Sequence, residues 1–136
     1  MKTFSTRIAV RDYELDSQGI VNNANYLHYL ELARHEFCQQ ARYSFAQMAA
    51  DGLDPVVRRA ELDYIAPLRM GDVMEVELTM TRRGAKFLFN QAIFRAADHS
   101  PVLRAVITIA CLEGGRISRG DRLAEKFADY LTDSEQ

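Results

Sequence analysis

The sequence has few of the residues that interrupt or cross-link a chain: among 136 residues there are 3 Pro, 7 Gly, 2 Cys and no Trp. Cys38 and Cys111 lie among apolar neighbours, so we expect two buried thiols in a reducing cytoplasm and no disulfide framework. No apolar run reaches the roughly 18 residues that a membrane span needs. Residues 1–10 also lack the apolar stretch of a signal peptide. These absences predict a cytoplasmic protein without a membrane span.

Neither charge sign dominates. The 17 Lys and Arg residues face 19 Asp and Glu residues, and the net charge of −2 argues against nucleic-acid binding. The sequence contains no G-x-S-x-G elbow, no phosphate-binding or dinucleotide-binding glycine loop, no C-x-x-C and no H-E-x-x-H. We therefore expect neither a cofactor nor a metal. With 48% hydrophobic residues, the chain is long enough for one domain, residues 1–136.

Apolar periodicity predicts one strand, a long helix and then mostly strands. The helix runs from Ala24 to Ala41, with Asn22 or Asn23 as its cap. A second, short helix starts at Ser44 and ends at Gly52. The expected strands are Thr3–Tyr13, Val56–Ile65, Val73–Arg83, Lys86–Ala96 and Val102–Leu112, followed by a terminal helix over Asp121–Leu131.

Four consecutive strands joined by short turns must pair mainly antiparallel, because parallel crossovers need longer connections. A long helix with one apolar face is buried only by lying across that sheet. The pattern therefore predicts an α+β domain in which a curved, mainly antiparallel five-stranded sheet wraps around a long helix.

The segment from Val10 to Tyr26 joins the first strand to this helix and is the part of the sequence most typical of a reactive site. It places Asp16 in a turn just before the helix start. The first turn of a helix offers unpaired N–H donors and a partial positive charge, which suit a developing oxyanion. An acid close to such donors is a minimal arrangement for acyl transfer. Taken alone, however, an Asp before a helix is more often a turn or cap residue.

The pattern Asp16-x-x-Gly19-x-Val21-x-x-x-x-Tyr26, running into a long helix, resembles the hotdog-fold thioesterases of the 4-hydroxybenzoyl-CoA thioesterase type. The fuller string VRDYELDSQGIVNNANY and Arg34-His35-Glu36 are most similar to the plant acyl-lipid thioesterases and their bacterial relatives. The resemblance covers about residues 4–122. It implies a hotdog fold and hydrolysis of acyl-CoA or acyl carrier protein thioesters.

The resemblance also implies roles for single residues. Asp16 matches the family's nucleophile or general base, and Asn23 matches the position whose backbone N–H polarises the thioester carbonyl. Gly19 matches the small turn residue and Tyr26 an aromatic residue of the helix. Val21 and Asn22 complete the substrate-binding segment. In this family an acyl tunnel runs between two protomers, so a dimer or a tetramer is expected.

Basic residues beside the expected hairpin, Arg83 and Lys86, suit the phosphates of CoA or the acidic surface of an acyl carrier protein.

Two other functions stay open: a dehydratase or hydratase acting on 3-hydroxyacyl thioesters, and a non-catalytic acyl-binding module. A calcium loop starting at Asp12 is disfavoured, since Ser17 and Asn23 stand where Gly and Glu would be needed. On a strand, Asp12, Glu14 and Asp16 would share one face. The three histidines are scattered along the sequence.

Overall fold

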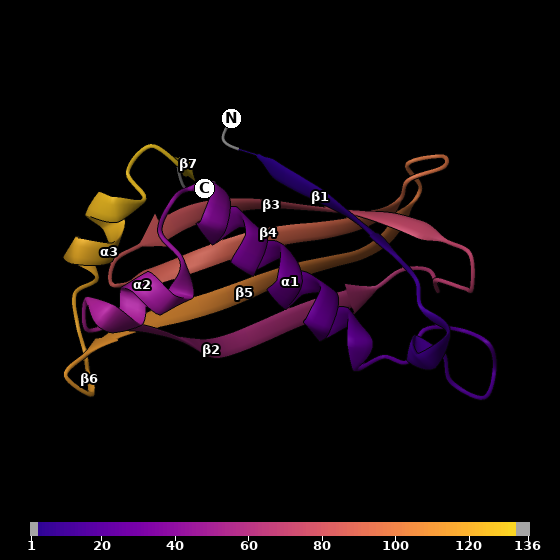
Figure 1. The fold of residues 1–136 in the computed structure, drawn as a ribbon, viewed down its shortest axis with the longest axis horizontal. Coiled ribbons are helices and arrows are strands. Elements are labelled where there is room, and N and C mark those ends of the chain that lie inside the picture. The colour runs from indigo at the N-terminus through magenta and orange to yellow at the C-terminus, as the bar shows by residue number, and fades with distance from the viewer. Residues whose placement is uncertain (1–2, 133–136) are drawn as a thin grey trace.

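The computed structural model describes residues 3–132, which form seven strands and a few short and long helices (Figure 1). In chain order the elements are β1 (Phe4–Ala9), η1 (Asp12–Glu14), α1 (Asn25–Gln40), α2 (Phe45–Ala50), β2 (Leu53–Tyr64), β3 (Val73–Arg83), β4 (Lys86–Arg95), β5 (Pro101–Glu113), β6 (Arg116–Ile117), α3 (Asp121–Lys126) and β7 (Leu131–Thr132). No helix in this described part is both long and apolar enough to cross a membrane.

The sheet is built on five antiparallel strands in the order β1-β3-β4-β5-β2. Two two-residue strands are added to this path: β6 pairs with β5, and β7 runs parallel to β3. The predicted α+β architecture is confirmed. The β3 strand has the predicted bounds, and β2, β4 and β5 differ from prediction by one to three residues.

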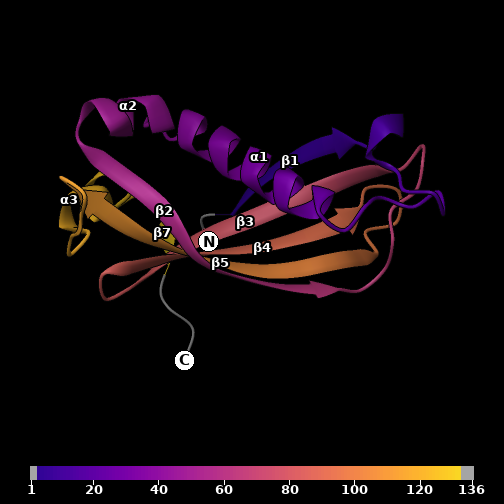
Figure 2. The same cartoon turned by 90° about the horizontal axis from the view of Figure 1, so that it is seen from below.

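Figure 2 shows α1 lying on one side of the sheet, which curls around it. Side chains of β3 alternate between the two faces of the sheet. Met74, Val76 and Leu78 are buried on the face that α1 covers, whereas Glu75 and Glu77 lie on the other face. From the helix, Leu30, Ala33 and Phe37 complete this core. Cys38 and Cys111 are both free and buried, as expected from the sequence.

Two predicted elements are wrong in extent. The first strand ends at Ala9 rather than Tyr13, and residues 12–14 form a 3₁₀ turn, so Asp12, Glu14 and Asp16 do not share a strand face. The terminal helix ends at Lys126 rather than Leu131. Phe127 stacks on Phe37 with ring centroids 5.8 Å apart, and Leu131 pairs with β3. Packing against the core therefore overrides the helical spacing in this segment.

Candidate active site

The loop between β1 and α1 is a small hairpin pinned against the residues that follow β2. Leu15 and Val21 form an antiparallel bridge, and Ile20 forms another with Arg69. The N–H of Val21 donates to the carbonyl of Leu68 over 2.9 Å. In return, the N–H of Leu68 donates to the hydroxyl of Tyr26 over 3.1 Å. The backbone of the predicted substrate-binding segment is therefore fixed by long-range bonds, although most of its side chains are exposed.

Glu14 is the residue that holds this loop together, and sequence reasoning missed it. Its side chain is buried and accepts hydrogen bonds from the guanidinium of Arg11 at 2.6 and 2.9 Å and from the hydroxyl of Tyr29 at 2.8 Å. Its carbonyl accepts from the backbone N–H of Asn22 and the side-chain amide of Asn25, both at 2.9 Å. The available signal was an acidic residue directly between an aromatic and an apolar neighbour, Tyr13 and Leu15.

The pKa of Glu14 shows the balance of forces in this cluster. Burial alone would raise the pKa, but the hydrogen bonds from the side chain and backbone of Arg11 and from Tyr29 outweigh burial and lower it below its ordinary value. The pKa of Tyr29 is raised, first by burial and then by its bond to this carboxylate. Glu14 is therefore ionised and fully engaged at neutral pH, and it serves the loop as an anchor.

Asp16 sits at the turn of the small hairpin and is only partly engaged. Its N–H donates to the carbonyl of Ile20 over 2.8 Å. Its Oδ1 accepts from the N–H of Gln18 at 2.8 Å and from that of Ile20 at 3.3 Å. Its Oδ2 receives no hydrogen bond from residues 3–132. Gly19 has a φ of +79°, which a residue with a Cβ rarely adopts, so backbone conformation rather than space requires glycine there.

At the helix start the two asparagines differ. Asn22 accepts twice, from the N–H of Ala24 at Oδ1 and from the N–H of Asn25 at its carbonyl, both at 2.9 Å. Asn22 thus provides acceptors for two backbone N–H groups at the start of α1. The N-cap residue, Ala24, makes no side-chain hydrogen bond. The N–H of Asn23 has no hydrogen-bond acceptor within the described part of the chain. This free donor lies where the sequence predicts the group that polarises a carbonyl.

A cavity of about 240 Å³ opens at the start of the helix, and Asn23 is one of the residues that line it. Val21, Asn23 and Tyr26 line it together with Tyr64 and Ile65 from the end of β2. The Tyr64 hydroxyl donates to the carbonyl of Asn23 over 3.2 Å, which ties the helix start to this strand. Asp16, Gly19 and Asn22 do not line the cavity. The backbone of Asp16 is hydrogen-bonded to Ile20, and Ile20 does line the cavity.

Arg83 and Lys86 lie far from this loop in the single chain. They pair with each other across the β3–β4 turn, whereas the loop meets the start of β3 through the bond from the Val10 N–H to the Asp72 carbonyl. Figure 1 places the loop after η1 and the β3–β4 turn at opposite ends of the sheet. One chain therefore does not bring these two predicted residues to Asp16.

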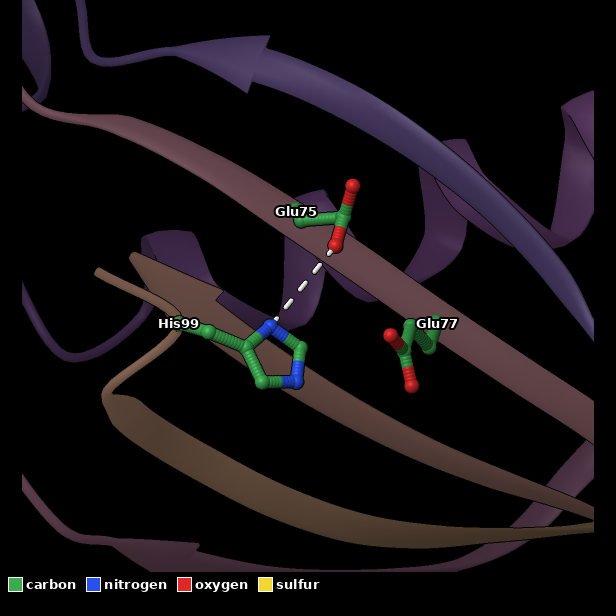
Figure 3. Close-up of side chains that lie close together, drawn as sticks. All are labelled: Glu75, Glu77 and His99. Atoms are coloured by element: carbon green, nitrogen blue, oxygen red, sulfur yellow. Dashed lines mark ion pairs between the residues drawn. The ribbon is translucent and has the colours of Figure 1, made fainter. Parts of the chain in front are cut away.

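The structure also gathers three side chains that looked unrelated in the sequence. Glu75, Glu77 and His99 offer ligand atoms within 4.8 Å of one another on the sheet face away from α1 (Figure 3). His99 Nδ1 is 3.9 Å from Glu75, whose other oxygen is 3.6 Å from Arg7. The His99 ring stacks on Phe94 at 4.1 Å. Ion pairs and stacking account for Glu75 and His99 but not for Glu77, and the absence of a metal site stays a prediction.

A curled antiparallel sheet around one long helix, with an acidic loop before that helix, defines a hotdog-fold domain. The chain belongs to the thioesterase-like superfamily, which it matches over residues 10–129. It is 33% identical over 99 residues to an acyl-acyl carrier protein thioesterase, ATL3, of Arabidopsis thaliana, covering 72% of this chain and 52% of that protein. The chain thus spans about half the length of this plant relative.

Bacterial relatives match over more of their length. The acyl-CoA thioester hydrolase YbgC of Escherichia coli is 30% identical over 116 residues, which is 83% of this chain and 86% of that protein. The crystal structure of a hypothetical protein from Aquifex aeolicus superposes with a TM-score of 0.83 at 32% identity, covering 90% of this chain and 98% of that one. The resemblance to this family that the sequence suggested is confirmed.

Proposed function

We propose that the protein is an acyl thioesterase that hydrolyses acyl-CoA or acyl carrier protein thioesters to a free acid and a thiol. Family membership supports this, as do relatives named for both carriers. The proposal rests on Asn23, whose N–H has no acceptor among residues 3–132 and which lines a cavity beside the loop that holds Asp16. A substrate carbonyl in this cavity would accept from that N–H.

In the proposed reaction the carbonyl oxygen becomes an oxyanion, which the Asn23 N–H and the positive end of α1 stabilise. Asp16, with Oδ2 free of protein donors, either accepts the proton of the attacking water or attacks the carbonyl itself. The carbon–sulfur bond then breaks, and the thiolate takes up a proton. After direct attack by Asp16, a water molecule must next hydrolyse the acyl–Asp16 anhydride, which releases the acid and restores the carboxylate. Tyr26, buried and bonded to the N–H of Leu68, holds the cavity wall in place.

We also propose that two copies of the chain build the complete site. β2 is an outer strand of the sheet, and Val57, Tyr64 and Ile65 expose 54%, 53% and 49% of their surface. A long outer strand leaves one row of backbone N–H and C=O groups unpaired, and such an edge can pair with another strand. Antiparallel pairing of two β2 strands about a twofold axis would set the end of one strand, beside the cavity, against the start of the other.

This pairing would also give Arg83 and Lys86 a role. Both Lys86 and Val56 lie opposite Ala110 of β5, so the β3–β4 turn is level with the start of β2. In the proposed dimer, the basic turn of one protomer therefore approaches the Asp16 loop of its partner. Its charge suits the phosphates of the carrier. A reducing compartment such as the cytoplasm agrees with two free, buried thiols.

The test is thiol release measured over a series of acyl-CoA and acyl carrier protein thioesters, with light scattering for the assembly. Release of stoichiometric thiol and acid supports hydrolysis. Conversion of a 3-hydroxyacyl thioester without thiol release identifies a dehydratase or hydratase, and binding without any conversion identifies an acyl-binding module. Hotdog dehydratases and hydratases use a histidine in catalysis. Within residues 3–132 no histidine lines the cavity, which favours hydrolysis over dehydration.

A further inference from the structure

A second cavity lies at the other end of α1, away from the Asp16 loop. It measures about 290 Å³, near the lower limit for small-molecule sites. The second half of α1, α2, α3 and the sheet enclose it, and Figure 1 shows these elements gathered at one end of the molecule. We call it the Arg34 pocket; its lining includes Arg34, Phe45, Met48, Phe89, Leu123 and Phe127.

Arg34 is the unusual residue of this pocket. It is 8% exposed, although a guanidinium is among the groups least often buried without a partner. Its Nη1 donates to Gln91 Oε1 over 3.0 Å, and Gln91 in turn donates to the carbonyl of Leu30 over 3.1 Å. No other hydrogen bond of the Arg34 guanidinium is found among residues 3–132. A guanidinium offers five donors, so most of its capacity is unused.

Arg34 also lacks an ion-pair partner. Within the described residues no Asp or Glu forms an ion pair with it. Glu31, which lies three residues before Arg34 on the helix, is 3.7 Å from His35, at the exposed rim of the pocket. Burial lowers the pKa of Arg34 from its ordinary value, while the charge of Glu31 opposes this shift. A buried, unpaired cation is costly unless an anion or a hydrogen-bond acceptor joins it.

Apart from Arg34 and the two polar rim residues, Glu31 and His35, the lining is apolar. Met48, Leu123 and Phe127 are 2%, 2% and 1% exposed, and Phe45 covers the rim beside His35 at a ring distance of 4.4 Å. A ligand that satisfies this pocket has one negatively charged planar group and a short hydrocarbon body. A carboxylate matches the fork of a guanidinium.

We propose that the Arg34 pocket binds an alkyl carboxylate, with the carboxylate on the Arg34 guanidinium and the hydrocarbon among Phe45, Met48 and Phe127. The carboxylate belongs either to a free acid or to the far end of an acyl group presented as a thioester. The free-acid case is independent of the proposed hydrolysis, whereas the acyl-group case rests on it.

Titration calorimetry on the full chain tests the first source with octanoate and the uncharged octanol as probes. We expect the wild-type protein to bind octanoate at least tenfold more tightly than octanol. Arg34→Met should lose this preference and Arg34→Lys should keep part of it, while Arg7→Met, which alters an exposed arginine on the opposite sheet face, should bind like wild type. The comparison of the two ligands on unaltered protein stays informative even if Arg34→Met does not fold.

Thiol release tests the second source by comparing octanoyl-CoA with suberyl-CoA, which has the same length and a terminal carboxylate. If the acyl group supplies the anion, Arg34→Met lowers kcat/KM for suberyl-CoA at least tenfold more than for octanoyl-CoA. A protein that binds octanoate through Arg34 yet releases no thiol from any thioester refutes the proposed function but not this pocket. Equal binding of octanoate and octanol, together with no selective effect of Arg34→Met, would overturn the proposal.

Discussion

Two ionisable groups near α1, Asp16 in the loop before the helix and Arg34 in its second half, both have unused hydrogen-bonding capacity, but their surroundings are opposite. In the loop, Asp16 is partly exposed, and water can solvate its free Oδ2. In the helix, Arg34 is buried in an apolar cavity with one neutral partner. A solvated anion beside a free N–H suits a reaction with water. A desolvated cation suits the retention of an anionic ligand.

The largest expected effect is at Asp16. Asp16→Asn keeps the Oδ1 bonds from the backbone but removes the charge, so turnover of a good acyl thioester should fall by about 10²–10⁴-fold. The free energy of unfolding should change by no more than about 0.5 kcal/mol, because the turn is retained. Steady-state thiol release and chemical denaturation measure the two quantities. Asp12→Asn, a neighbouring acid outside the hairpin turn, is the matched control, and equal loss in both variants would contradict the assignment.

Glu14→Gln should act mainly on stability. Its carboxylate accepts three side-chain hydrogen bonds from Arg11 and Tyr29, and the amide can replace only part of them. We expect a loss of about 1–3 kcal/mol in the free energy of unfolding, as is typical for bonds to a buried charged group. Urea denaturation measures this loss. Arg11→Met removes two of these three bonds and leaves the buried carboxylate with Tyr29 alone, so it should cost at least as much as Glu14→Gln.

The same residue predicts how stability depends on pH. The pKa of Glu14 in the folded protein is lowered from its ordinary 4.5, so the folded state holds this proton more weakly than the unfolded state. Its contribution is therefore fully present above the unfolded pKa and is lost as the pH falls through the folded pKa. Denaturation curves below about pH 4.5 should show a steeper loss for wild type than for Glu14→Gln. Parallel curves would show that Glu14 has no such role.

These contacts explain which features the sequence could predict. The β3 strand was predicted to the residue because Met74, Val76 and Leu78 alternate with Glu75 and Glu77 along it. The acid before the helix was also predictable, since Asp16 and Gly19 follow a family pattern. The roles of Glu14 and Arg34 were not, because each depends on a partner distant in sequence: Tyr29 for the first and Gln91, 57 residues away, for the second. Local periodicity contains no information on such pairs.

Ser44→Ala tests whether α2 holds its side of the Arg34 pocket in place, and we expect a moderate loss of stability. The Ser44 hydroxyl accepts from the N–H of Gln47 over 3.1 Å and caps α2, which supplies Phe45 and Met48 to the pocket. Loss of the cap should cost about 1 kcal/mol in the free energy of unfolding and weaken octanoate binding slightly. Ser44→Asp retains an acceptor and should restore stability. If both variants are equally unstable, the cap does not hold α2 in place.

The smallest change in stability is expected for charges on the sheet face away from α1. Because these charges are near the surface, they serve as a reference for Asp16 and Arg34. Glu75 faces Arg7 at 3.6 Å and His99 at 3.9 Å, and the side chains of both partners are more than half exposed. Exposed ion pairs contribute at most about 1 kcal/mol and weaken in salt, so Glu75→Gln should change the free energy of unfolding by less than that. Glu77→Gln is the control, since Glu77 forms no ion pair within residues 3–132. Denaturation at low and high salt compares the two variants. A salt-independent loss well above about 1 kcal/mol for Glu75→Gln would show that charge matters here as much as it does in the buried Glu14 cluster.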